Sequence, residues 1–145
     1  MVEEFECPPE LLPAAHLVGF RNRMDYAVEG TSIGLRPPQD FETVLDLTEC
    51  PVLRSPGPSL LAVCRELLQK FPGAGWSRSQ NNGWLKYVTI RVGPESGVVV
   101  LTTAGPIGET DDSRKLLKAL RDCMEEDWPA LNLVETITDP GQELS

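Results

Sequence analysis

The chain has 145 residues, of which 41% are hydrophobic and 24% charged, a length and composition typical of one globular domain. Its formal net charge of −9 argues against a strongly basic nucleic-acid-binding protein. The sequence contains neither a signal-like leader nor an apolar run of membrane length, so we expect a cytoplasmic protein with no membrane partner.

The acidic residues are concentrated toward the two ends of the chain. Residues 1–10 contain four acids and no base, and residues 104–145 contain ten acids and four bases. The central residues 11–103 contain nine bases and eight acids, which leaves this part almost neutral. The overall charge therefore does not exclude contact between the central arginines and a polyanion.

The domain is expected to open with a β-hairpin. Strand-like alternation from Gly19 to Val28 places Arg21, Arg23 and Asp25 on one face, so that the two arginines project side by side. Gly30 supplies the turn before a returning strand, because glycine tolerates the positive φ that tight turns need.

Further along the chain, the patterns predict four more strands, a hairpin turn and two helices. They are a strand over 43–47, a helix over 60–71 capped by Ser55 or Ser59, strands over 84–92 and 98–103 joined by a turn at 93–97, a helix from Thr110 to Trp128 capped by Thr110, and a last strand over 131–137. The order βββ-α-ββ-α-β predicts an α+β fold, a largely antiparallel sheet with two helices packed on one face. We expect one domain over residues 19–138, an extended lead-in over 1–18 and a tail over 139–145.

Chemistry-bearing motifs are sparse. Four cysteines, Cys7, Cys50, Cys64 and Cys123, form no C-x-x-C pair, and Cys64 and Cys123 fall on predicted apolar helix stripes, where they are expected to be buried. No phosphate-binding glycine loop and no nucleophile with a base partner can be assembled. Taken alone, the sequence does not predict an enzyme.

Four short stretches resemble a segment of the S-adenosylmethionine-dependent RNA uracil-5-methyltransferases, which methylate uracil C5 in tRNA and 23S rRNA. They are Gly19-Phe20-Arg21-Asn22-Arg23-Met24-Asp25-Tyr26, like the family's G-Y-R-x-[RK] strand; Gly34-Leu35-Arg36; Val44 to Pro51, like V-V-D-[IL]-x-x-C-x; and Trp84 to Arg91, like L-R-H-[LV]-V-[LV]-R. Their order and spacing extend the resemblance over roughly residues 19–138.

The resemblance implies a middle segment that holds RNA between an oligonucleotide-binding domain and a C-terminal methyltransferase domain. It implies that RNA meets the basic residues Arg21, Arg23, Arg36, Lys86 and Arg91, with Arg23 near the substrate nucleotide. The methyl-donor site and the catalytic cysteine belong to the C-terminal domain, so this chain would be non-catalytic, and whether it is part of an enzyme stays open. The alternative for the arginines is ion pairing with Asp25 or Asp46.

Cofactors implied by the resemblance are S-adenosylmethionine and, in some members, an iron–sulfur cluster. Cys50 matches the last cluster ligand, but the three upstream cysteines of a C-x5-C-x2-C motif are absent, so we expect no cofactor in this chain.

Two other functions remain open at this stage. One is a protein-interaction or scaffold domain that uses its acidic ends, including Glu125, Glu126 and Asp127. The other is a small metal-binding protein that uses the cysteines, which the missing ligand motifs argue against.

Overall fold

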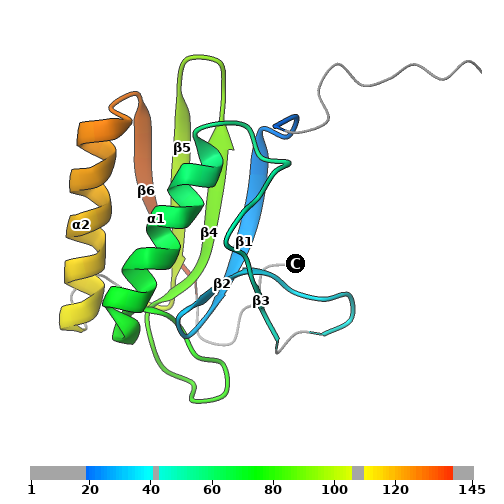
Figure 1. The fold of residues 1–145 in the computed structure, drawn as a ribbon. Helices are drawn as coiled ribbons and strands as arrows, with labels where there is room; N and C mark the ends of the chain where they lie inside the picture. The colour runs from blue at the N-terminus through cyan, green and yellow to red at the C-terminus, as the bar shows by residue number, and fades with distance from the viewer. Residues whose placement is uncertain (1–18, 41–42, 106–109, 139–145) are drawn as a thin grey trace, which may run out of the picture.

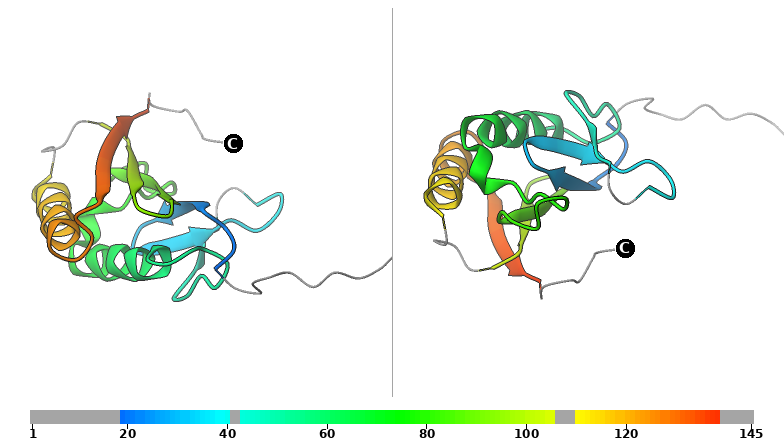
Figure 2. Two further views of the ribbon diagram at one scale, coloured as in Figure 1. Left: turned by 90° about the horizontal axis from the view of Figure 1, so that it is seen from above. Right: turned by 90° about the horizontal axis from the view of Figure 1, so that it is seen from below.

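A six-stranded mixed sheet covered on one face by two helices forms the fold (Figures 1 and 2). The computed structural model describes residues 19–40, 43–105 and 110–138; the predicted lead-in and tail, and Cys7, lie outside them. The elements are β1 (Arg23–Glu29), β2 (Ser32–Leu35), β3 (Leu45–Asp46), α1 (Gly57–Lys70), the 3-10 turn η2 (Pro72–Ala74), β4 (Leu85–Val92), β5 (Gly97–Thr103), α2 (Asp111–Asp127) and β6 (Leu131–Ile137).

The strand order is β3-β2-β1-β4-β5-β6, and all neighbours are antiparallel except β5 and β6, which are parallel. The crossover through α2 between β5 and β6 explains the parallel pair, since parallel strands need a long connection. The predicted α+β class, element order and one-sided helix layer are confirmed.

The core lies between the helices and one face of the sheet. Alternate residues of β1, including Met24, Tyr26 and Val28, point into it, and the apolar stripes of α1 and α2 meet them. Its largest members with almost no exposed surface are Trp84, Tyr26, Ile33, Leu53, Leu60, Leu61, Leu68, Leu85, Ile90, Leu101, Leu116 and Leu120. Because one sheet face is buried in this way, the alternate residues of the central strands are free to form a second face.

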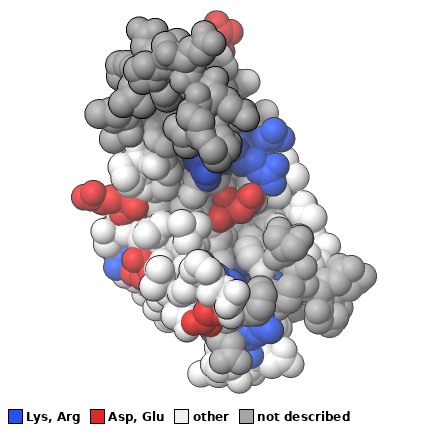
Figure 3. Space-filling model, turned by 90° about the vertical axis from the view of Figure 1, so that its right-hand side faces the viewer, with Lys and Arg blue, Asp and Glu red and all other residues white. Residues whose placement is uncertain are grey.

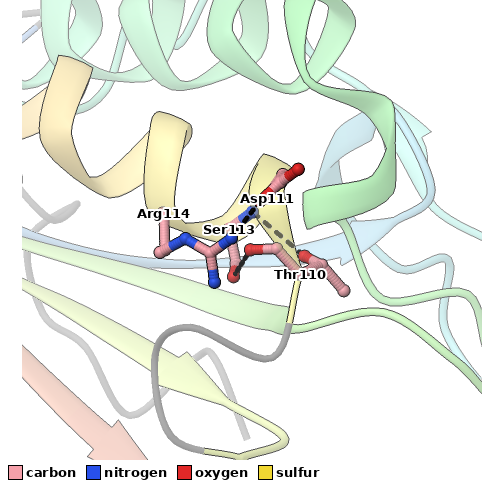
Figure 4. A network of polar contacts seen from close by, with 4 residues as sticks. All are labelled: Thr110, Asp111, Ser113 and Arg114. Atoms are coloured by element: carbon pink, nitrogen blue, oxygen red, sulfur yellow. Dashed lines mark hydrogen bonds and ion pairs between the residues drawn. The ribbon is translucent and has the colours of Figure 1, made fainter.

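The start of α2 is capped as predicted (Figure 4). The backbone N–H of Ser113 donates to Thr110 Oγ1 at 3.1 Å, and Ser113 Oγ donates to the carbonyl of Thr110 at 2.8 Å. Arg114 pairs with Asp111 on the first turn. These contacts satisfy groups that a helix start leaves unpaired, and Asp111 and Asp112 suit its positive end.

Two predicted boundaries are wrong. Neither Ser55 nor Ser59 caps α1: its N-cap is Pro56, without a side-chain hydrogen bond, and Pro58 in the first turn needs no N–H partner. The strand predicted over 43–47 shrinks to Leu45–Asp46, whose two residues pair with Leu35 and Gly34 of β2. α1 therefore starts without a serine cap, and one edge of the sheet is very short.

Candidate nucleic-acid interface

Arg23 and Arg91 lie directly opposite each other in the β1–β4 ladder. Both are exposed, and alternation with the buried Met24 and Ile90 puts them on the sheet face turned away from the helices. Arg23 Nη2 lies 3.3 Å from Asp25 Oδ1, in an ion pair whose side chains are about half exposed. The side chain of Arg91 has no hydrogen bond or ion pair with any described residue. Like charges opposite each other in a sheet repel, so this pair is not a stabilising device of the fold.

Arg21 is not part of this pair, so the predicted side-by-side presentation of Arg21 and Arg23 is wrong. β1 begins at Arg23, and Arg21 instead forms an isolated parallel bridge with Leu53. Its guanidinium Nη1 lies 3.5 Å from Sδ of Met24, whose side chain belongs to the helix-facing side. The chain bends at Asn22, whose carbonyl accepts from the N–H of Val92, and this bend ends the alternation.

Lys86 lies near the opposite end of β4 from Arg91, and Arg36 lines a recess beside Lys86. Lys86 is 4% exposed, and its Nζ lies 4.7 Å from the ring centroid of Trp76. Arg36 is half-buried and lines a small recess with Lys86, Trp76 and Arg78. The structure therefore separates the five predicted RNA-contacting residues, and the burial of Lys86 removes it from any surface shared with Arg91.

Two grooves flank the tip of the β4–β5 hairpin. One, of about 410 Å³, is lined by Asn22, Arg91, Val92, Gly93, Ser96, Gly97 and Val98. The other, of about 420 Å³, lies between the hairpin tip, the start of α1 and the end of α2, and Arg54 and Trp128 are among its walls. Arg54 is exposed, and its backbone N–H donates to the carbonyl of Arg21 at 2.7 Å, which fixes it at this end of the sheet.

Sequence reasoning missed Arg54, Asn22 and the hairpin tip as parts of the site. No local motif marks them, because they meet only through the β1–β4 register and the bridge to Leu53. Figure 3 shows that the described part of one side of the molecule carries basic and acidic side chains interspersed. The site is thus a local cluster of arginines rather than a continuous basic surface.

The sequence suggested Asp46 as an ion-pair partner for the hairpin arginines, but the structure pairs it with Arg65 instead. Its Oδ2 lies 2.8 Å from Nη2 of Arg65 on α1, and its Oδ1 accepts from the N–H of Ile33. Burial alone would raise the pKa of this carboxyl, but hydrogen bonds from Arg65 and Ile33, and the Arg65 charge, lower the pKa overall. Asp46 is therefore committed to holding β3 and α1 together.

We expect Asp46→Asn to lower the free energy of unfolding by about 0.5–1 kcal/mol at pH 7. The pKa of Asp46 is lower in the folded chain than in the unfolded chain, so its contribution is complete above the unfolded value and is lost as pH falls through the folded value. Urea unfolding should show the difference from the parent chain shrinking below about pH 4. The control is Glu66→Gln, which replaces an exposed carboxylate on α1 with a carboxamide. If the stability difference between Asp46→Asn and the parent chain persisted at acid pH, the ion-pair role of Asp46 would be contradicted.

The described residues contain no group of three or more His, Cys, Asp or Glu side chains that could hold a metal ion. Cys50 is buried beside Tyr26, whose hydroxyl has no hydrogen-bond partner among the described residues; burial first, and then Cys50, raise the pKa of the phenol far above its usual range. The residues described around Cys50 do not supply the four thiolates of a cluster.

The helix cysteines differ in exposure. Cys64 is buried as predicted, and burial, followed by Cys123, raises the pKa of its thiol to about 12. Cys123 is only half-buried, contrary to prediction, with Sγ 3.7 Å from Oδ2 of Asp127; burial and then the Asp127 charge raise its pKa as well. Thiols with raised pKa values are poor nucleophiles at neutral pH.

The acidic residues Glu125, Glu126 and Asp127 are all exposed in the last turn of α2, which contains no basic residue. Negative charge is unfavourable at a helix C-terminus. Within the described residues, neither helix is long and apolar enough to cross a bilayer.

The fold and the clustered arginines define the class of this molecule, an α+β domain with a candidate polyanion-binding end. No family model matches the chain. A tRNA (uracil(54)-C(5))-methyltransferase of Pyrococcus furiosus is 29% identical over 103 residues, which cover 71% of this chain and 25% of the relative. An uncharacterized RNA methyltransferase of Leptospira interrogans is 37% identical over 90 residues, which cover 61% of this chain and 20% of the relative.

A solved structure extends the likeness to the fold. The tRNA (uracil-54, C5)-methyltransferase of Pyrococcus abyssi, in complex with S-adenosyl-L-homocysteine, aligns with a TM-score of 0.64 and 19% identity over 92% of this chain and 31% of that chain. The chain spans only about a quarter of the length of the curated relatives it matches. The predicted resemblance is confirmed: this chain is homologous to a segment of the RNA uracil-5-methyltransferases.

Proposed function

We propose that this chain is a non-catalytic, RNA-contacting domain of, or related to, an RNA uracil-5-methyltransferase. The observation that carries the proposal is the cross-strand pair Arg23 and Arg91. Among the described residues, Asp25 pairs with Arg23 but no carboxylate pairs with Arg91, so the two guanidinium groups keep a net positive charge that a phosphate can neutralise. The homology to RNA methyltransferases supports RNA as the polyanion.

The chemistry of methylation belongs to other parts of the relatives. A uracil must leave its stack before a methyl group reaches its C5 atom, and arginine planes can hold the displaced strand by stacking and by phosphate contact. We infer that a C-terminal methyltransferase domain supplies S-adenosylmethionine binding and the catalytic cysteine. The substrate would be tRNA or rRNA, and the setting cytoplasmic. An iron–sulfur cluster does not fit the residues described around Cys50, so none is assigned to this chain.

Binding of a uridine-containing stem-loop RNA tests the proposal. In a filter-binding or anisotropy titration, Arg23→Ala and Arg91→Ala should each weaken binding and each reduce the slope of log K against log salt by about one. Lys115→Ala, which removes an exposed charge from α2, is the matched control and should leave most of the affinity. Equal, salt-insensitive affinities for the parent chain and its three variants would overturn the RNA role.

A second candidate is a scaffold domain that binds a basic partner through Glu125, Glu126 and Asp127. The observation in its favour is the uncompensated negative charge on the last turn of α2. A basic peptide bound by the chain, and released when these three residues become amides, would support this function over RNA binding.

A further inference from the structure

We propose that the groove between the β4–β5 hairpin tip and the end of α2 holds one unstacked RNA base, and that it favours a base with an amino donor group, guanine, cytosine or adenine, over uracil. This inference rests on the proposed function and names the RNA feature that the same end of the sheet recognises. The RNA backbone would cross the hairpin tip, with its phosphate on the Arg91 side.

The two grooves adjoin at the hairpin tip. Both are lined by Val92, Gly93 and Ser96, so the tip is a shared wall between them. Of these shared residues, Gly93 and Ser96 carry little or no side chain. Each groove has a volume of about 410–420 Å³, within the range of small-molecule binding sites. A single strand can therefore place its phosphate in one groove and its base in the other.

The charges of the two grooves differ in a way that orients the strand. Arg91 is the sole charged residue among the described walls of the first groove, which therefore attracts phosphate. The second groove contains the carboxylates of Glu95 and Asp127 beside Arg54, so its net charge repels phosphate. The backbone is thus expected on the Arg91 side and the base on the other.

The second groove has the groups that recognise a base. Trp128 is half-buried and provides an indole surface, and bases stack on aromatic rings in single-stranded RNA recognition. Carboxylates only accept hydrogen bonds, so Glu95 and Asp127 require donors from the base. Guanine presents N1–H and N2–H groups, cytosine an N4–H group and adenine an N6–H group, whereas uracil places two carbonyl oxygens beside its one N3–H.

The test uses the full 145-residue chain and three fluorescein-labelled RNA hexamers, UUGUUU, UUCUUU and UUUUUU, whose common flanking base is the disfavoured uracil. Anisotropy titrations should give about tenfold tighter binding of the guanine and cytosine hexamers than of the uracil hexamer. The double variant Glu95→Gln/Asp127→Asn, both exposed positions, should reduce this ratio to about one. Quenching of tryptophan emission by the guanine hexamer should fall in Trp128→Phe.

The control is Glu66→Gln/Glu126→Gln, which removes the same two charges from exposed helix positions outside the groove. It raises affinity for every hexamer through net charge but leaves the ratio unchanged. Equal binding of the three hexamers, with normal losses in Arg23→Ala and Arg91→Ala, would overturn the base groove and leave the RNA role standing. Absence of binding to the stem-loop and to all hexamers would overturn both.

Discussion

Replacing Trp84 with alanine is expected to lower the free energy of unfolding by about 3–5 kcal/mol. The side chain is 0% exposed, and its Nε1–H donates to the carbonyl of Gly105 at 3.1 Å. The change opens a large cavity at the start of β4 and also removes one of the two donors to that buried carbonyl, which keeps its hydrogen bond from Thr103 Oγ1. Urea unfolding followed by circular dichroism measures the loss, and it is large beside the total stability of most domains.

Two matched variants separate the causes of this loss. Trp84→Phe keeps much of the packing but removes the hydrogen bond to Gly105, so it should destabilise less than alanine. Val134→Ala, at a position that is 44% exposed on β6, should change stability by less than about 0.5 kcal/mol. If Trp84→Ala were as mild as Val134→Ala, the placement of Trp84 in the core would be wrong.

Gly75→Ala is expected to destabilise the chain by about 1–3 kcal/mol or more, although only one methyl group is added. An added Cβ would lie 1.7 Å from the carbonyl oxygen of Gly30 and 3.2 Å from Cδ2 of Leu68. The backbone of Gly75 has φ −76 and ψ 136, which alanine adopts freely, so the cost comes from space alone.

The Gly75→Ala substitution should also weaken the contacts between the β1–β2 turn and the segment that contains Trp76 and Arg78. The N–H of Gly30, in the β1–β2 turn, donates to the carbonyl of Trp76 at 2.8 Å, and the carboxylate of Glu29 accepts from the N–H of Arg78. Hydrogen exchange at Gly30 should therefore accelerate in Gly75→Ala. Gly93→Ala, where the nearest atom is the Ser96 carbonyl oxygen at 3.1 Å, is the milder control. Equal stability of the two variants would contradict the close approach.

The features that the sequence predicts well are those that depend on neighbouring residues. The last strand falls at Leu131–Ile137 as expected, and the Thr110 cap forms as expected, because alternation and capping act within a few residues. The first strand is different. Its alternation stops at Asn22 because the backbone of Arg21 pairs with Leu53, more than thirty positions along the chain.

The candidate site depended on pairings that no local pattern contains. The sequence indicated Arg23 and Arg91 separately, but only the β1–β4 register brings them opposite each other. For Lys86, the sequence pattern predicts the wrong environment. A lysine in a strand is expected to reach solvent, yet Lys86 lies buried with its ammonium over Trp76, and the ladder is irregular between Leu85 and Tyr87. A cation–aromatic contact of this kind becomes visible only when distant segments are placed together.

The two margins of the sheet are unequal, since β3 has two residues and β6 has seven. Among the described elements β6 pairs only with β5, and its Val134 and Ile137 are exposed. A long outer strand offers a row of backbone donors and acceptors to any incoming strand, whereas a two-residue strand offers almost none. Growth of this sheet by strand addition is therefore directional, confined to the β6 margin and away from the arginine cluster on β1 and β4.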